Sequence, residues 1–266
     1  MTSPAAPVAH SINTDEHTVT LSVMGATGPR SRLIIDTSRD GVWVFTNRSS
    51  VTSADAAALG GELRVVAPEG TELLLWDVPS GSAFDRIARA GGWRLRTVKV
   101  FVERNLTTLG SSTDPVTARW ALTTLADVGV EEFAALLLRA SEGDPFETST
   151  AESATSDLQA LIDGAGDAFD PTQWVIASDG NGVIGAVLPQ RQADAPKTGT
   201  IFYMGVIPER RTQGHGARLH MLGLQRLRRL GVEKYVGSTD QQNTAMIQVF
   251  RQNGTQATRT QTYYTR

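Results

Sequence analysis

Residues 206–217, with the sequence VIPERRTQGHGA, constrain the fold of this chain more than any other stretch. A β-branched, strand-like segment ends at Pro208, and Gly214 and Gly216 precede an apolar pattern of helical period. Backbone N–H groups at the start of a helix have no intrahelical partner, and the helix dipole adds partial positive charge there. The stretch is therefore a candidate anion-binding loop. An ordinary strand-to-helix connection with two turn glycines is the simpler alternative.

Two common phosphate-binding motifs fit this loop poorly. A P-loop requires Lys followed by Ser or Thr after its last glycine, and the chain has Ala217 and Arg218 there. The chain matches the first two glycines of the dinucleotide fingerprint, and Glu233, about twenty residues on, matches its ribose-binding acid. Its third small position is Leu219, however, and a polar run separates the strand from the glycines. An NAD-type oxidoreductase is thus the less favoured interpretation.

The same loop resembles the acyl-CoA signature of the GNAT acetyltransferase superfamily. In that signature Arg or Gln is followed by two free positions, Gly, one free position, and Gly or Ala, which Arg211, Gly214 and Gly216 match. The preceding residues 206–208 resemble the Val-x-Pro that closes the family's fourth strand. Downstream, a set of residues resembles the Asn, Ala, Tyr and Gly of the family's next helix: Asn243, Met246, Phe250 and Gly254.

The resemblance implies that acetyl-CoA is the co-substrate. Backbone N–H groups of residues 211–217 would take the pyrophosphate, and main-chain atoms near Met204 and Val206 would pair with the pantetheine arm between two splayed parallel strands. The imidazole of His215 is expected to point to solvent. The residues implied at acetyl-CoA are Met204, Val206, Arg211, Thr212, Gln213, Gly214, His215, Gly216, Ala217, Asn243 and Phe250.

The implied reaction is direct attack of a primary amine, on a small molecule or peptide, on the acetyl thioester. The absence of cysteine excludes a cysteine nucleophile and thiolate metal ligands, and no metal site is predicted. The chain has Thr200 where many family members carry a glutamate that acts as the base. It has Phe250 where many carry a tyrosine that protonates the departing thiolate. The substitute catalytic candidates are Tyr203, Ser238 and Asp240. A non-catalytic acyl-CoA-binding protein is the alternative.

The predicted fold class is α/β with a mixed sheet, in two domains. We expect a mobile lead-in over residues 1–16, a β-rich domain over 17–104, a linker over 105–118 and a GNAT-like domain over 119–266. The first domain resembles a degenerate copy of the second; an unrelated β-rich domain is the alternative. Its predicted strands are 18–24, 32–36, 42–46, 62–67, 72–78 and 93–103, and its predicted helices are 54–59 and 83–90.

The predicted elements of the second domain lead to the glycine loop and away from it. They are helices over 130–140, 156–162, 216–230 and 243–253, and strands over 120–123, 174–177, 183–188, 200–207 and 234–238. Between the first two helices, Glu142, Asp144 and Glu147 could attract an amine or form a solvated loop.

The net charge and hydropathy of the chain limit the classes of binding partner that we expect. The net charge of -3 and the pI near 5.8 give no electrostatic reason to expect nucleic acid or an anionic membrane. The chain has neither a secretory leader pattern nor a segment long and apolar enough to span a bilayer. We therefore expect a cytoplasmic monomer or homodimer.

Overall fold

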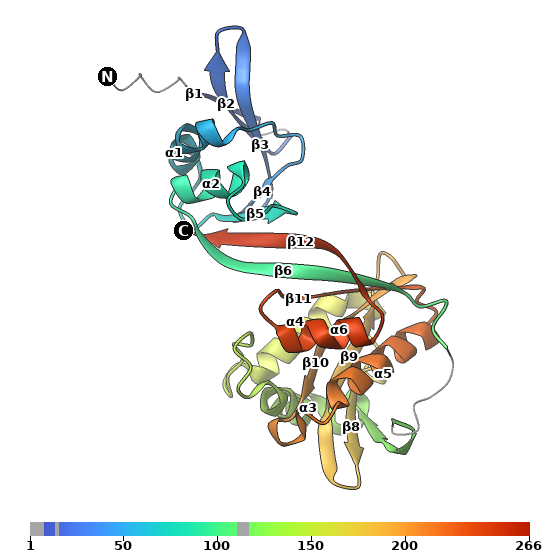
Figure 1. Ribbon diagram of the computed structural model, residues 1–266. Helices are drawn as coiled ribbons and strands as arrows, with labels where there is room; N and C mark the ends of the chain where they lie inside the picture. The colour runs from blue at the N-terminus through green and yellow to red at the C-terminus, as the bar shows by residue number, and fades with distance from the viewer. Residues whose placement is uncertain (1–7, 14–15, 111–116) are drawn as a thin grey trace. The chain divides into compact units, whose positions relative to one another are not determined.

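The computed structural model describes residues 8–13, 16–110 and 117–266, which form two compact units (Figure 1). The first unit comprises the chain up to Val100 together with Arg259–Arg266, and the second comprises Phe101–Thr258. These bounds differ from the expected domains, because the end of the chain belongs to the first unit. The predicted linker lies partly outside the described residues, at 111–116.

The sheet of the first unit starts as an antiparallel meander. It contains, in spatial order, β1 (Val8–Asn13), β2 (Thr18–Gly25), β3 (Gly28–Arg39), β4 (Val42–Phe45), β5 (Glu72–Trp76) and the end of β12 (Gln256–Thr265). The β4–β5 pair is parallel, and β12 pairs antiparallel with β5. The prediction of a mobile lead-in is wrong for residues 8–13, because β1 pairs with β2 along its whole length. Residues 1–7 and 14–15 of that lead-in lie outside the described residues.

Two helices complete the first unit: α1 (Ala56–Val66) and α2 (Ala83–Ala90). The predicted strand over 62–67 is wrong, since this segment lies in α1 up to Val66. Leu59 and Leu63, four residues apart, are fully buried on one face, whereas Val65 is 76% exposed. A Cβ at Gly60 would lie 2.6 Å from the carbonyl oxygen of Ile87, so the glycine allows close packing against α2. Tertiary packing thus overrides the β propensity of the valines.

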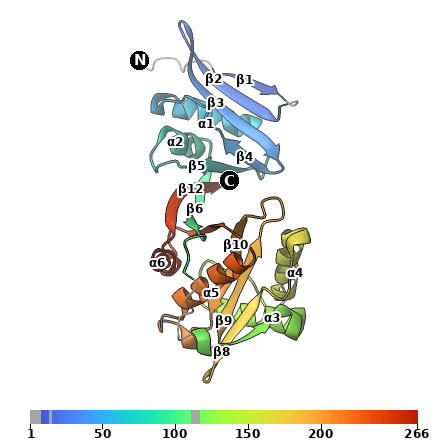
Figure 2. The same ribbon diagram turned by 90° about the vertical axis from the view of Figure 1, so that its right-hand side faces the viewer.

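The second unit has a mixed sheet with helices on both faces. Its strand order is β6 (Arg94–Asn105, of which 101–105 belong to this unit), β11 (Lys234–Asp240), β10 (Thr198–Val206), β9 (Gly182–Arg191), β8 (Val175–Asp179) and β7 (Ala121–Thr124). Its helices are α3 (Leu125–Ser141), α4 (Ala154–Ala165), α5 (His215–Arg229) and α6 (Thr244–Gln252). Figure 2 shows α3 and α4 on one face of β9 and β10 and α5 on the other.

Each face of this sheet has its own apolar cluster. Phe133 and Leu158, from α3 and α4, pack with Trp174 ahead of β8. On the opposite face, Leu219 and Leu222 of α5 pack with Val187 of β9. Gly223 lets α5 approach closely, since a Cβ there would lie 2.7 Å from Cδ1 of Ile201. The two clusters hold β10 between helical layers, which fixes the strand that leads into the glycine loop.

The same order of elements occurs twice along the chain. In the first unit β4, α1, β5 and α2 lead to β6, and in the second β10, α5, β11 and α6 lead to β12. The final strands are exchanged: the end of β6 lies beside β11 in the second unit, and the end of β12 lies beside β5 in the first. This repeated order is what a resemblance between the two halves implies.

The two copies differ at the parallel strand pair. In the first unit β4 and β5 are paired from Val42 with Glu72 to Phe45 with Leu75, over the full length of β4. Close to the start of α1, the buried carboxylate of Asp55 accepts hydrogen bonds from Arg30, Ser31 and Thr52. These bonds, of which that from Arg30 has the largest effect, lower the pKa of Asp55 to about 2. The protein's own carboxylate is therefore the anion held at this place.

The exchanged end of β12 should stabilise the first unit. Tyr264 is 2% exposed, and its hydroxyl donates a hydrogen bond to the carboxylate of Asp85. Removing this hydroxyl in Tyr264→Phe leaves a buried carboxylate short of one donor, so we expect a loss of about 1.5–3 kcal/mol from the free energy of unfolding. Denaturant titration followed by the fluorescence of Trp43 and Trp93 measures it. Tyr263→Phe, at a half-buried neighbour, is the control, and equal stability of both variants would contradict the prediction.

Candidate active site

Strand β10 parts from its parallel neighbour β11 soon after it begins. The paired residues are Thr198 with Lys234 and Gly199 with Tyr235, although β10 continues to Val206. Residues 200–206 are all half-buried, although β10 lies inside the sheet. The prediction of adjacent parallel strands is confirmed, but they diverge after Gly199 and not past Val206. The second half of β10 therefore has one backbone edge that no β11 residue pairs with in the described register.

A β-bulge changes which side chains β10 presents to each face. The register with β9 shifts between Ile201 and Met204. The consecutive side chains of Phe202 and Tyr203 both pack on the α3 and α4 side, whereas Ile201 and Met204 pack on the α5 side. In a regular strand, neighbouring side chains point to opposite faces. The bulge thus places two aromatic rings at one pocket.

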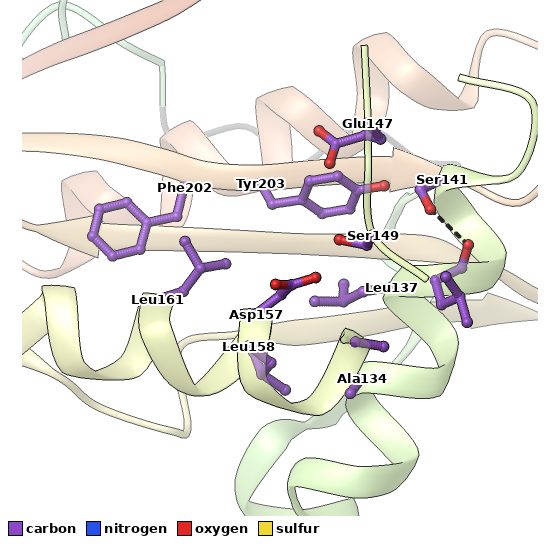
Figure 3. A pocket seen from close by; sticks show the side chains of 12 residues that line it. Ala134, Leu137, Ser141, Glu147, Ser149, Asp157, Leu158, Leu161, Phe202 and Tyr203 are labelled. Atoms are coloured by element: carbon purple, nitrogen blue, oxygen red, sulfur yellow. Dashed lines mark hydrogen bonds between the residues drawn. The ribbon is translucent and has the colours of Figure 1, made fainter. Parts of the chain in front are cut away.

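That pocket has a volume of about 220 Å³ and lies between α3, α4 and β10 (Figure 3). Its lining residues are Ala134, Leu137, Leu138, Ser141, Glu147, Ser149, Ala154, Asp157, Leu158, Leu161, Phe202 and Tyr203. Burial, together with the negative charges of Glu147 and Asp144, raises the pKa of Tyr203 well above its ordinary value. Its phenol is therefore protonated at neutral pH. Of the predicted acids, Glu147 lines the pocket.

The glycine loop is held by two arginines that point back into the protein. Arg210, 9% exposed, donates to both carboxylate oxygens of Asp179 at 3.0 and 2.6 Å. Arg211 donates from Nε to the carbonyl of Val206 and from Nη2 to that of Ala140, both at 3.0 Å. The guanidinium of Arg211, a residue predicted at acetyl-CoA, therefore ties the end of β10 to the end of α3. Its contribution to the site is the shape of the loop.

The backbone of the loop adopts left-handed angles at two positions before α5. Thr212 has φ 61° and Gly214 has φ 75°, and Gly214 is the N-cap of α5 without a side-chain capping bond. Gln213 donates from Nε2 to the carbonyl of Glu209 at 3.2 Å. The first turn of α5 thus starts from bare backbone, as an anion-binding helix start requires.

His215 is buried in this loop, so the prediction that its imidazole points to solvent is wrong. The residue is 8% exposed, with its ring 5.9 Å from that of Trp120 and its Nε2 3.4 Å from Nη2 of Arg210. Burial and the positive charge of Arg210 lower its pKa. Trp120, which precedes β7 and is distant in sequence, covers the ring. The imidazole is therefore a neutral packing group under the loop.

A second cavity, of about 410 Å³, adjoins the start of α5. It is lined by Thr117, Gly214, Ala217, Arg218, Met221, Leu222, Gln225, Gln252 and Asn253. Gly216 lies close by, and a Cβ at that position would lie 3.4 Å from Cγ2 of Val249 in α6. The start of α5 therefore lies beside an open cavity that the guanidinium-bearing residue Arg218 helps to line.

Two predicted contacts on α6 have structural roles. The side-chain oxygen of Asn243 accepts a hydrogen bond from the backbone N–H of Met246 at 2.9 Å and so caps α6. Phe250 is 3% exposed, and its ring meets that of His220 edge-on at 5.4 Å. The structure thus brings these residues to the core and helix cap beside α5, separate from the glycine loop.

A buried polar network that sequence reasoning missed joins α5, β11 and α6. His220 is fully buried; Nδ1 lies 2.9 Å from Nδ2 of Asn253 and Nε2 lies 3.2 Å from the hydroxyl of Tyr235. Asn253 also donates to the carbonyl of Ala217 at 2.8 Å. Burial lowers the pKa of His220 to about 3, so it is neutral. The sequence signal for this network is the position of His220 on the apolar face of a helix. Its partners, Tyr235 and Asn253, are distant in sequence and could not be predicted from that position.

The three predicted catalytic residues lie on two neighbouring strands, Tyr203 on β10 and Ser238 and Asp240 on β11. Tyr203 lines the 220 Å³ pocket. Ser238 is exposed on β11, and the carboxylate of Asp240 accepts from the N–H of Gln242 at 2.7 Å in the turn before α6. Thr200 lies half-buried opposite Gln190.

The described residues contain neither a metal-binding cluster nor a membrane-spanning helix. No group of three or more His, Cys, Asp or Glu side chains within residues 8–13, 16–110 and 117–266 could hold a metal ion. Among these same residues, no helix is long and apolar enough to cross a membrane.

The second unit is an α/β domain in which two parallel strands part, a glycine-capped helix follows, and two cavities lie nearby. Residues 136–255 match the model of the acetyltransferase (GNAT) family. This part of the chain contains β10, the glycine loop, α5, β11 and α6. This region is thus similar to the GNAT acetyltransferases, and the predicted resemblance to that superfamily is confirmed there.

Two curated relatives are similar to part of the chain. Mycothiol acetyltransferase of Geodermatophilus obscurus is 29% identical over 90 residues, which is 32% of this chain and 29% of the relative. Mycothiol acetyltransferase of Pseudarthrobacter chlorophenolicus is 32% identical over 103 residues, which is 37% of this chain and 31% of the relative. The matches thus span about three tenths of the length of each relative.

Solved structures extend the likeness to both units. A GCN5-related N-acetyltransferase from Sphaerobacter thermophilus has a TM-score of 0.60 at 16% identity, over 94% of this chain and 80% of that one. A tandem GNAT protein from the clavulanic acid biosynthesis pathway has a TM-score of 0.54 at 16% identity, over 99% of this chain and 83% of that one. At this identity the likeness concerns the fold, and the predicted fold class, an α/β mixed sheet of GNAT type, is confirmed.

The ion pair between Arg210 and Asp179 should keep the glycine loop ordered. The hydrogen bond from Arg210 is the main cause that lowers the pKa of Asp179. A carboxyl group with a lowered pKa stabilises the folded state above its unfolded pKa, and this effect is lost as the pH falls through the folded value. We expect Asp179→Asn to lower the amide protection factors of residues 208–217 at pH 7, and to lessen the loss of protection that we expect in the wild type as the pH falls. Asp163→Asn, on exposed α4, is the control; unchanged protection factors in Asp179→Asn would refute the role.

Proposed function

We propose that the second unit transfers an acetyl group from acetyl-CoA to a primary amine of a small molecule or peptide. The observation that carries this proposal is the parting of β10 from β11 after Gly199, immediately before a glycine-capped helix start. An unpaired strand edge suits the amide-bearing arm of an acyl-CoA, and the helix start suits its pyrophosphate. The match of residues 136–255 to the acetyltransferase family supports the same activity.

The residues around the loop fit the cofactor's phosphates. Gly214 and Gly216 leave bare backbone at the start of α5, and the adjoining 410 Å³ cavity is lined by Arg218. Backbone N–H groups of residues 211–217 would hold the pyrophosphate, while Met204 and Val206 would offer main-chain groups to the arm. When bound, acetyl-CoA supplies the acetyl thioester. The loop arginines and the buried His215 shape this cradle from beneath.

The pocket on the other side of β10 suits the acceptor amine. During the transfer a C–N bond forms and the C–S bond breaks; the amine nitrogen loses a proton and the departing sulfur gains one. Tyr203 lines this pocket, and its raised pKa keeps the phenol protonated, so it suits a proton donor better than a base. Holding the two reactants in attack geometry can lower the barrier by about 7–11 kcal/mol.

A non-catalytic acyl-CoA-binding protein is the second candidate. The buried ring of Phe250 has no proton to donate where the family resemblance implies a tyrosine, and Thr200 is not a carboxylate. Both candidates bind acetyl-CoA. Steady release of free thiol in the presence of a panel of primary amines supports the enzyme, while tight binding without transfer to any amine supports the binding protein.

Gly216→Val should abolish acetyl-CoA binding. The new Cβ would lie 3.4 Å from Val249, and its branches would fill the space beside the start of α5. For the wild type, ligand at about a hundred times its dissociation constant should stabilise the fold by roughly 2.7 kcal/mol, seen as a rise in melting temperature. We expect no rise in Gly216→Val. Gly61→Val is the control, because a Cβ at that helical position in the first unit meets nothing within 4 Å.

The same titration tests the loop assignment itself. An unchanged dissociation constant for acetyl-CoA in Gly216→Val would place the pyrophosphate elsewhere. A rise in melting temperature with NAD and none with acetyl-CoA would revive the dinucleotide interpretation of Gly214 and Gly216.

Tyr203→Phe should lower kcat by about 100-fold while the dissociation constant of acetyl-CoA changes little, because the phenol is proposed to act as the proton donor. In the wild type, the raised pKa keeps the donor protonated to above the ordinary tyrosine value of about 10, so activity should persist into alkaline solution. The measurement is a pH profile of thiol release, with Tyr263→Phe in the first unit as control. Unchanged kcat in Tyr203→Phe would show that the proton travels by another route.

A further inference from the structure

We infer that the acceptor is a compact amine that carries a second positive charge, a short aliphatic diamine. This inference rests on the proposed function, since it assigns the acceptor class of the 220 Å³ pocket. Two carboxylates, Glu147 and Asp157, line that pocket from different segments of the chain (Figure 3). Glu147 belongs to the connection between α3 and α4, and Asp157 to the first turn of α4.

The electrostatic surroundings of the pocket are negative. Asp144 acts on Tyr203 together with Glu147, and both raise the pKa of its phenol; the one opposing positive charge at Tyr203 is Arg211. The guanidinium of Arg211 donates to the carbonyls of Val206 and Ala140, which holds it in the loop. Two negative charges and one positive charge therefore act on the phenol of Tyr203, and the carboxylate of Asp157 also lines the pocket. A carboxylate-bearing acceptor would be repelled, and a cationic one attracted.

Asp157 is held in its ionised form. The hydroxyl of Ser153 donates to Oδ2 of Asp157 at 2.8 Å, and a further hydrogen bond comes from Ser149, which also lines the pocket. These bonds lower the pKa of Asp157, with Ser149 as the larger cause. An acid in the first turn of a helix also favours the helix dipole. Stabilisation by the helix dipole does not require an acid to line a cavity, whereas the carboxylate of Asp157 lines this pocket.

The remaining walls match a short hydrocarbon chain. Leu137, Leu158, Leu161 and the ring of Phe202 are apolar, and they line the same pocket as the acids and hydroxyls. Methylene groups can contact these walls while the second ammonium meets Asp157. The amine that reacts would then lie at the Tyr203 side of the pocket.

Three acceptors with the same four-carbon chain test the inference: putrescine, butylamine and γ-aminobutyrate. They differ in the far group, which is an ammonium, a methyl or a carboxylate. With saturating acetyl-CoA, we expect kcat/KM for putrescine to exceed that for butylamine by about tenfold, with γ-aminobutyrate lowest. Equal or higher values for butylamine or γ-aminobutyrate would overturn the diamine assignment while leaving acetyl transfer intact.

Asp157→Asn tests the carboxylate directly, because it keeps the shape and one acceptor oxygen for Ser153. We expect the putrescine-to-butylamine ratio of kcat/KM to fall to near one, chiefly through the KM of putrescine. Asp163→Asn is the matched control on the same helix; its carboxylate accepts from Gln159 at 2.9 Å, and it is not among the pocket's lining residues. A ratio unchanged in Asp157→Asn, or equally reduced in Asp163→Asn, would contradict the role of Asp157.

Failure of the proposed function can be told apart from failure of this inference. If no amine gives thiol release, transfer itself is refuted, and calorimetric titration of putrescine and butylamine into the full-length protein then decides the pocket's preference. Putrescine binding that is tighter than butylamine binding, weakened by Asp157→Asn and by added salt, supports the cationic pocket. Equal binding of the two amines, or no binding of either, overturns it.

Discussion

The parting of β10 from β11 is the constraint on which the site depends. Parallel pairing ends at Gly199 and Tyr235, so the next residues of β10 have one edge that the sheet does not use. The strand nevertheless keeps its place, because helices pack on both of its faces and Arg211 ties its end to α3. The opening is therefore built into a rigid frame, and a ligand would meet a preformed edge.

The first unit shows what the same order of elements does without that opening. Its β4 and β5 stay paired along the whole of β4, and Asp55 is an internal anion close to the start of α1. The continuous pairing of β4 with β5 leaves no free strand edge of the kind that an acyl-CoA arm would need. We therefore attribute a structural role to this unit, and the chemical groups discussed above all lie in the second.

Local patterns predicted the parts of the site that local sequence controls. The strand, the glycine loop and helix α5 were all visible in order, as was the helix Ala83–Ala90. The bulge at Phe202 and Tyr203, the burial of His215 under Trp120 and the helical state of residues 62–66 were not, because each depends on a partner distant in sequence. Arg211 matches the family signature, but its hydrogen bonds to Val206 and Ala140 required the structure.

The exchange of β6 and β12 makes the two units inseparable by a single cut. Severing the chain at residues 105–118 would leave the first half without the β12 residues that pair with β5, and the second half without the β6 residues beside β11. Each fragment would expose a strand edge that promotes association with another chain. Each sheet is therefore completed by a strand from the other half of the sequence: residues of β12 pair with β5, and the end of β6 lies beside β11.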